Sequence, residues 1–347
     1  MSEPDAGSGA GRWGVRVAGD GDAADLLRLY ECDAAAGDLA VLTTRRPDPL
    51  ASLRTEGDRV VFPVVTDNES GRVIGGGACV IRRASVGGVD RTVCYLTGLK
   101  LLPEYRRQVP LMARIYGWAR ELTADVDLYY TTIMADNAAA QRLLTGRRRR
   151  GMPEYRPAGG YTTWCFRTPP VRLPRWGLRL ELGTASDLVS PGFDLEPVRP
   201  LAPESWVLRD RSGAVVASAG VWDQRAHRQY IVLRYGGAYE HLHRLPTALI
   251  GYPRLPRPGA VAAQASVTQL WVRDWDPALA RLFLGALSRV HRRFDYLVWG
   301  AHASHPLAGP LAGLRGVRLD SLLYTVHFDD ACLPLSGGPV GLDVALL

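Results

Sequence analysis

The first half of the chain contains the run Tyr95-Leu96-Thr97-Gly98-Leu99-Lys100-Leu101-Leu102-Pro103-Glu104-Tyr105-Arg106-Arg107. We interpret this run as a strand that leads through a turn into an amphipathic helix at residues 106–122. Residues 126–133 then have the pattern of a second strand, and Asp136-Asn137 is a typical cap for a short helix that ends at Leu144. The order strand, helix, strand, helix indicates an α/β fold.

The same order recurs in the second half of the chain. There, we expect a helix at residues 278–293, a strand at 295–299 and a short helix at 302–313. Upstream, residues 64–75 and 207–218 both have an apolar run on each side of an Asp/Ser/Gly turn, which predicts a hairpin. The repeat extends to the start of each half, where a strand and a capped helix are expected at residues 16–27 and again at 179–189. A repeat unit of about 150 residues indicates a duplicated domain rather than a solenoid.

The predicted organisation has a proline-dense linker between the copies, because Thr168-Pro169-Pro170-Val171-Arg172-Leu173-Pro174 cannot continue a helix or a central strand. The parts are a disordered tail (1–13), an N-terminal domain (14–168), a linker (169–177), a trimmed C-terminal domain (178–330) and a C-terminal tail (331–347).

Composition limits the classes of protein that the chain can represent. Its 347 residues are 47% apolar, which is ample for two packed cores. No apolar run approaches the roughly 20 residues that cross a bilayer, and the N-terminus has no signal pattern, so we expect a cytoplasmic protein without a membrane partner. The five cysteines form no C-x-x-C pair, and the histidines lack a third ligand at a recognisable spacing. We therefore expect neither a disulfide framework nor a metal site.

The net charge of +7 comes from arginine, since Lys100 is the sole lysine. The run Arg147-Arg148-Arg149-Arg150 is either a solvated loop or a contact for a polyanion. A basic surface favours anionic partners such as the phosphates of CoA or an RNA.

The strand, helix, strand, helix unit resembles the GNAT (Gcn5-related N-acyltransferase) fold, and the whole chain resembles a tandem GNAT over about residues 14–330. The run from Tyr95 to Arg107 is similar to that family's fourth strand and its entry into the acyl-CoA loop. Asp136-Asn137-Ala138-Ala139-Ala140 is similar to the family's N-x-x-A motif. The resemblance implies a duplicated α/β fold with mixed central sheets flanked by helices.

The resemblance also implies a donor site in the first domain. Its acyl-CoA residues are Leu99, Leu101, Arg106, Arg107, Gln108, Val109, Leu111 and Asn137. The family's loop places glycines where backbone N–H groups approach the CoA pyrophosphate at a helix N-terminus. Here Val109 and Leu111 take those places and Pro110 removes one N–H donor, so the loop is degenerate. In the second copy, the matching residues 272–277 contain no glycine, and we expect no CoA there.

Catalytic groups that are common in the family are missing from their usual positions. The fourth-strand carboxylate has no counterpart between Tyr95 and Leu101, and Leu144 stands where many members have a tyrosine. Aminolysis can still proceed when a neutral amine is oriented against the carbonyl and donors face the developing oxyanion. Three tyrosines, Tyr129, Tyr130 and Tyr161, lie near the expected cleft and serve either core packing or acid catalysis and acceptor stacking.

A polar segment of the second copy supplies the remaining candidates. Alternation along a strand places Trp222 and Gln224 on one face, and Asp223 and Arg225 on the other. The Asp223–Arg225 pair is then either a structural ion pair at the domain interface or part of substrate recognition. In the second case, Asp223 has a catalytic role, and the substrate is bound by Trp222, Arg225 and Gln229.

Three functions follow from this reading. The first is transfer of an acetyl or other acyl group from acyl-CoA to a small-molecule amine, with no tightly bound cofactor. The second is an aminoacyl-tRNA-dependent transferase on the tandem fold, for which tRNA is the partner and a pyrophosphate cradle is not needed. The third is a catalytically inactive pair that acts as a binding module, which the missing catalytic groups favour.

Overall fold

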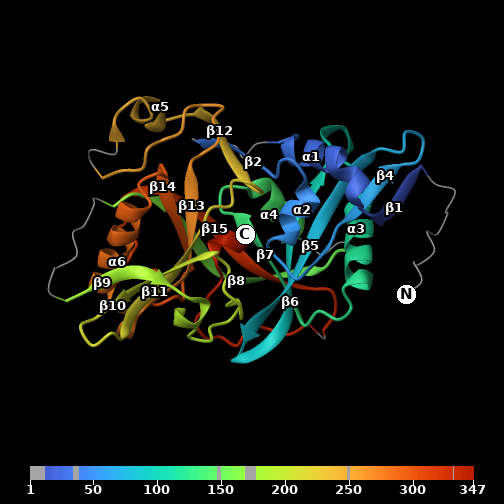
Figure 1. Ribbon diagram of the computed structural model, residues 1–347. Coiled ribbons are helices and arrows are strands. Elements are labelled where there is room, and N and C mark those ends of the chain that lie inside the picture. The colour runs from blue at the N-terminus through green and yellow to red at the C-terminus, as the bar shows by residue number, and fades with distance from the viewer. Residues whose placement is uncertain (1–11, 34–38, 147–149, 169–176, 248–250, 331) are drawn as a thin grey trace.

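Two similar α/β halves share one continuous mixed sheet in the computed structural model of the chain (Figure 1). The structure describes residues 12–33, 39–146, 150–168, 177–247, 251–330 and 332–347. The strand order in the large sheet is β1-β4-β5-β6-β7-β15-β8-β14-β13-β11-β10-β9, with β3 paired to β5. A separate ribbon pairs β2 of the first half with β12 of the second.

The first half supplies the strands at one end of the sheet and the helices packed on them. Its strands are β1 (Trp13–Val17), β2 (Leu39–Thr44), β3 (Arg59–Val61), β4 (Pro63–Asp67), β5 (Val73–Val86), β6 (Val89–Leu101), β7 (Leu128–Met134) and β8 (Glu154–Phe166). Its helices are α1 (Ala23–Glu31), α2 (Pro49–Arg54), α3 (Val109–Leu122) and α4 (Ala138–Leu144).

The second half repeats this arrangement with fewer helices. Its strands are β9 (Arg179–Gly183), β10 (Glu204–Arg209), β11 (Val215–Trp222), β12 (Gln229–Tyr235), β13 (Gln264–Val272), β14 (Tyr296–His302) and β15 (Gly316–His327). Its helices are α5 (Tyr239–Leu242) and α6 (Pro277–Val290). Helices α3 and α6, which follow equivalent strands, lie at opposite ends of the molecule (Figure 1).

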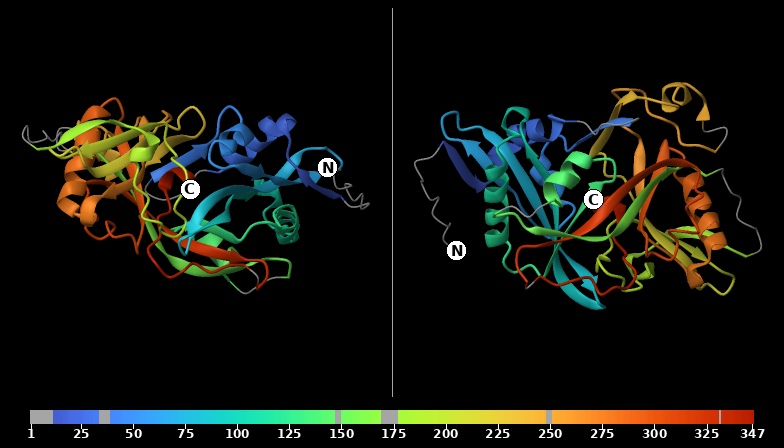
Figure 2. Two further views of the ribbon diagram at one scale, coloured as in Figure 1. Left: turned by 60° about the horizontal axis from the view of Figure 1, so that its bottom comes forward. Right: turned by 180° about the vertical axis from the view of Figure 1, so that it is seen from behind.

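The two halves exchange their last strands. Strand β8, the last of the first half, pairs with β14 of the second half, and β15, the last of the second half, pairs with β7 of the first. Strands β8 and β15 also pair with each other along most of their lengths, and the view from behind shows them side by side across the middle of the molecule (Figure 2). The exchange joins the two half-sheets into one.

Each half contains one pair of parallel strands that separate after a short contact. Strands β6 and β7 pair only from Val93–Leu128 to Tyr95–Tyr130, and then diverge. Strands β13 and β14 pair only from Gln264–Tyr296 to Ser266–Val298. Beyond these contacts the strands leave a wedge-shaped gap in the sheet, which we call the split.

Most of the elements that the sequence predicts are present. The predicted hairpins are β4–β5 and β10–β11, and the helix after the quoted run is α3. Asn137 caps α4 as expected, because its side chain accepts a hydrogen bond from the Ala140 N–H at 3.0 Å. The predicted domain boundaries stay a prediction, since residues 169–176 of the linker lie outside the described part of the chain.

Two helix predictions for the second half are wrong. His302 is the last residue of β14 and residues 303–313 form successive turns, while residues 185–189 contain only a short 3₁₀ turn at Ala185–Asp187. In that turn, Asp187 accepts hydrogen bonds from the backbone and hydroxyl of Thr184, as at the start of a helix, but Leu188 has an extended backbone with a ψ of 128°, so the turn does not continue into a helix. No helix among the described residues is long and apolar enough to cross a membrane.

Candidate functional site

A cleft of about 270 Å³ opens on the α3 side of the split between β6 and β7. The separating strands form its walls, and α3 and α4 contribute Ile115, Tyr116, Ala119, Ala140 and Leu144. Strand β5 contributes the small residues Gly77 and Ala78, and β6 contributes Thr97, which leave the space open. The cleft is therefore a direct result of the divergence of two parallel strands, with a helix on each side.

A bulge in β6 distorts the sheet at this cleft. The pairing of β5 with β6 shifts register between Gly76 and Ala78, and Gly98 adopts the left-handed conformation with a φ of +65°. A Cβ atom at position 98 would lie 2.7 Å from the hydroxyl of Tyr30, so only glycine fits here. The bulge brings the β6 backbone and the Tyr30 hydroxyl together at the split.

The hydroxyl of Tyr30 is buried and has no hydrogen-bond partner among the described residues. Two cations flank its ring, the guanidinium of Arg45 at 5.9 Å from the ring centre and the ammonium of Lys100 at 6.0 Å. Burial raises the pKa of Tyr30, and the charge of Arg45 opposes that rise. Unpaired buried hydroxyls are rare because each costs free energy, so this group is available to a ligand. Sequence reasoning missed Tyr30, which carries no motif.

A second cavity of about 340 Å³ lies between the two halves, on the other face of the split. Its wall is mostly aliphatic and aromatic and includes Tyr30, Val41, Tyr230, Val298 and Leu319. Four residues line both cavities: Tyr95, Thr97, Thr132 and Met134. The cavities thus meet where β6 and β7 separate.

The side chains along the two cavities include few groups that could accept a proton. None of the described lining residues is Asp, Glu or His. Tyr95 bonds to the hydroxyl of Thr132 at 3.0 Å, and burial raises the pKa of Tyr95. Lys100 donates to the carbonyl of Tyr30 at 2.7 Å, and burial lowers the pKa of Lys100.

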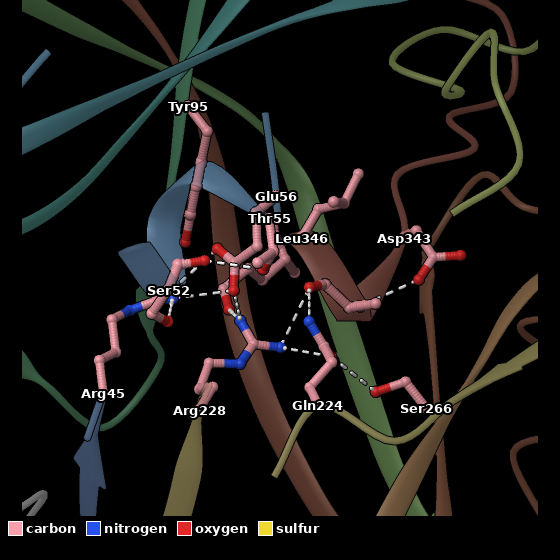
Figure 3. Close-up of polar contacts among 12 residues, drawn as sticks. Arg45, Ser52, Thr55, Glu56, Tyr95, Gln224, Arg228, Ser266, Asp343 and Leu346 are labelled. Atoms are coloured by element: carbon pink, nitrogen blue, oxygen red, sulfur yellow. Dashed lines mark hydrogen bonds and ion pairs between the residues drawn. The ribbon is translucent and has the colours of Figure 1, made fainter. Parts of the chain in front are cut away.

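A buried network of charges joins the halves beside the second cavity (Figure 3). Glu56, two residues after the end of α2, pairs with Arg45 at 2.9 Å and with Arg228 of the second half at 3.3 Å. All three side chains are at most 4% exposed. The two guanidinium groups hold the pKa of Glu56 low against the opposing effect of burial. Arg228 and Gln224 also donate to the carbonyl of Ala345, which fixes the C-terminal segment of the chain against this network.

At the entrance to the cleft, before α3, two backbone N–H groups already have partners within the chain. The Gln108 N–H donates to the Tyr105 carbonyl at 2.9 Å, and the Leu111 N–H donates to the Gln108 carbonyl at 3.0 Å. Pro110 has no N–H. Of the N–H groups that should form a pyrophosphate cradle, those of Gln108 and Leu111 are therefore used within the chain.

The equivalent split in the second half is filled by side chains. Phe193 stacks on Trp275 with ring centres 5.3 Å apart, and His305 makes edge contacts with Trp275 and Trp299. The cavity that remains, which Gln269 and Asp343 also line, measures about 30 Å³. That space is too small for a donor.

The structure separates the residues that were predicted to bind CoA. Leu99 and Asn137 line the cleft, whereas Leu101 and Leu111 are buried in the hydrophobic core. Arg106, Arg107 and Gln108 are exposed at the entrance, where Arg106 pairs with Asp33, and Val109 begins α3. Of the arginine run, residues 147–149 lie outside the described residues, and Arg150 is exposed.

The predicted catalytic tyrosines lie in the core. Tyr130 packs on Tyr95 with ring centres 5.3 Å apart, and burial raises the pKa of Tyr130 to about 12. Tyr161 donates to the Leu342 carbonyl at 3.2 Å. Neither residue is among those that line the two cavities.

The predicted substrate residues of the second copy lie near the junction of the halves. Asp223 and Arg225 form an ion pair at 2.7 Å, and Arg225 covers the ring of Phe294, outside both cavities. Trp222 ends β11, and Gln229 exchanges two hydrogen bonds with the backbone of Arg46 in the first half. Gln224 and Arg228 contact the buried network instead.

Of the histidines, His241 lies in α5 and His243 directly follows that helix. No group of His, Cys, Asp and Glu that could hold a metal occurs among the described residues.

Comparison with solved structures shows the same arrangement elsewhere. A tandem GNAT protein from the clavulanic acid biosynthesis pathway matches 93% of this chain and 99% of its own, with a TM-score of 0.53 and 14% identity. The chain has a duplicated GNAT fold. N-myristoyltransferase from Saccharomyces cerevisiae with bound myristoyl-CoA matches 91% of this chain and 79% of its own, with a TM-score of 0.53 and 10% identity. Neither a protein-family model nor a curated protein matches the sequence.

Within the GNAT fold, β6 and β7 are the separating strands of the first copy, and β13 and β14 are those of the second. The open cleft thus belongs to the first copy, and the second copy has its own split closed by aromatic side chains. At these identities the likeness establishes the fold.

Proposed function

We propose that this chain is an N-acyltransferase that moves an acyl group from a thioester to an amine. The pantetheine arm of the donor lies in the cleft between β6 and β7. The acceptor amine lies in the cavity between the halves, whose largely apolar wall selects a molecule with an apolar body.

The observation that supports this proposal is the meeting of the two cavities at the split. Tyr95, Thr97, Thr132 and Met134 belong to both linings, so a thioester in one cavity and an amine in the other reach the same point. Holding two reactants in this way converts a bimolecular step into an effectively unimolecular one.

The chemistry needs little from acids and bases. The amine enters uncharged, its nitrogen attacks the thioester carbonyl, the C–N bond forms and the C–S bond breaks. The proton that the nitrogen loses ends on the thiol that leaves. The Tyr30 hydroxyl, buried beside the bulge and without a partner, donates a hydrogen bond to the developing negative charge.

Filling the cleft tests the proposal. Ala140 lies on α4 and lines the cleft, while its neighbour Ala139 is exposed and does not. We expect Ala140→Trp to abolish thiol release from acetyl-CoA and acetyl-pantetheine in the presence of a panel of apolar primary amines, and Ala139→Trp to retain it. Thiol release is followed with a chromogenic disulfide. Equal rates in both variants, or no release by the unchanged protein with any amine, would refute the proposal.

A further inference from the structure

We propose that the natural donor is an acyl thioester of phosphopantetheine carried on an acidic protein, rather than free acyl-CoA. The inference rests on the proposed function, because both donors place the same arm in the same cleft. They differ in what lies outside it: CoA continues into a pyrophosphate and a phosphorylated adenosine, whereas the carrier's arm ends in one phosphodiester on a serine.

The cleft itself fits the part that the two donors share. It is narrow, it lies between two strand edges, and its lining combines apolar side chains with Thr97, Thr131, Thr132 and Asn137. A flexible arm with two amide groups can pack against such walls and bond to strand edges. The interior of the cleft therefore does not distinguish the donors.

The entrance does distinguish them. A pyrophosphate at a helix N-terminus is held by several free backbone N–H groups. Here the N–H groups of Gln108 and Leu111 donate to carbonyls of the chain, and Pro110 contributes none. A pyrophosphate at this place could use the N–H groups of Gln108 and Leu111 only if those hydrogen bonds broke. A single phosphodiester that is already fixed to a protein needs no such cradle.

The charge around the entrance suits an acidic partner. The loop before α3, the two helices beside the cleft and the segment after them carry five exposed arginines: Arg106, Arg107, Arg114, Arg142 and Arg150. The acidic residues of the same region are Glu104 and Asp136, Asp33, which pairs with Arg106, and Glu121 at the far end of α3. A Cβ atom on Gly151 would lie 3.1 Å from the Cβ of Ala113 in the first half of α3, so Arg150, the preceding residue, is close to that helix. The excess of positive charge would steer an acidic protein toward the cleft.

The same surface is poorly suited to an RNA. Proteins that hold single-stranded ends of RNA stack bases on exposed aromatic rings. The large apolar side chains that are exposed in the described part of the chain are all valine or leucine. A protein partner, which needs complementary charge without base stacking, agrees better with these observations.

In the transfer from such a carrier, the acyl carbon loses its bond to the sulfur of the arm and gains a bond to the acceptor nitrogen. The nitrogen's proton is taken up by the sulfur, and the carrier leaves with a free thiol. No further reactant is consumed.

Calorimetric titration of the whole chain tests the inference without knowledge of the acceptor. The ligands are three stable acetyl analogues with nitrogen in place of the thioester sulfur: the pantetheine arm alone, the CoA form, and a bacterial acyl carrier protein loaded with the arm. We expect the loaded carrier to bind at least about tenfold tighter than the CoA form at low salt, and this advantage to shrink as salt increases.

Charge reversal supplies the matched control. Arg107→Glu and Arg150→Glu should weaken binding of the loaded carrier several-fold, whereas Arg179→Glu, on the exposed far edge strand β9, should not. Tighter binding of the CoA form, equal binding of a carrier without its arm, or tighter binding of aminoacyl-tRNA would overturn the inference. If even the pantetheine arm fails to bind, the proposed function itself fails, which separates the two results.

Discussion

Replacing Tyr30 with phenylalanine should change activity and stability in opposite directions. The substitution removes a single oxygen, and that oxygen is buried at the bulge without a partner. Leaving a buried polar group unsatisfied costs about 1–3 kcal/mol, so its removal should stabilise the fold by up to that amount. For a chain of this size, we expect the melting temperature to rise by about 2 °C per kcal/mol.

Activity should fall in the same variant. If the hydroxyl donates to the charge that develops in the transition state, its loss should lower kcat by about 10²–10³-fold, as for other oxyanion donors. KM should change little, because the bond forms mainly in the transition state. The assay is thiol release from acetyl-pantetheine with the best amine of the panel, together with thermal unfolding of both proteins.

Tyr129→Phe is the matched control for this experiment. Its hydroxyl is also buried, but it donates to the Thr123 carbonyl at 2.5 Å and lies outside both cavities. The control should therefore lose about 1 kcal/mol of stability. A Tyr30→Phe protein that melts lower and keeps its kcat would refute our assignment of the hydroxyl.

Three further predictions concern the charged groups. Glu56→Gln should lower the free energy of unfolding, measured by chemical denaturation, by about 3 kcal/mol, because it leaves Arg45 and Arg228 buried without their shared carboxylate. A decrease below about 1 kcal/mol would show that water reaches the two guanidinium groups. Burial lowers the pKa of His305 to about 4, whereas a histidine in the unfolded chain has a pKa of about 6.5. The free energy of unfolding should therefore keep its full value above pH 6.5 and fall by about 3 kcal/mol as the pH drops toward 4, because only the unfolded chain binds the proton in this range. In His305→Gln, the free energy of unfolding should therefore depend less steeply on pH. The titratable neighbours of His305 include His302, Glu196 and Asp343, and an unchanged slope would assign the pH dependence to them. Asp223→Asn should alter stability by less than about 1 kcal/mol and leave thiol release intact, since the pair with Arg225 is partly exposed and outside both cavities; a large loss of activity would restore Asp223 as a substrate residue.

Local patterns in the sequence predicted the local structure well. The hairpins have a turn signal between two apolar runs, and α3 and α4 have a helical spacing or a cap, so each can be recognised from neighbouring residues alone. Residues 302–313 looked helical for the same kind of reason. There, His302 is still part of β14, and its side chain bonds locally to Ser304 and across the sheet to the Ala158 carbonyl, which favours a turn after the strand over a helix.

The site was less predictable because it depends on residues that are distant in sequence. Asn137 and Leu99 could be found from a motif, but Tyr30 meets Gly98 only through the packing of α1 on the sheet. The Asp223–Arg225 pair forms as predicted, yet its place outside the cavities depends on how β11 ends. The exchange of β8 and β15 carries no signal within either strand, since each has the pattern of an ordinary strand.

That exchange also determines the order in which the molecule can be completed. On the ribosome, β7 emerges long before β15, its neighbour in the finished sheet, because nearly the whole second copy separates them in the sequence. The gap that β15 closes is flanked by β7 and β8, so until its residues 316–327 have been synthesised, both strands keep an unpaired edge. The first copy, with the open cleft, thus reaches its final form only when the second is nearly complete, and the two copies fold as one unit.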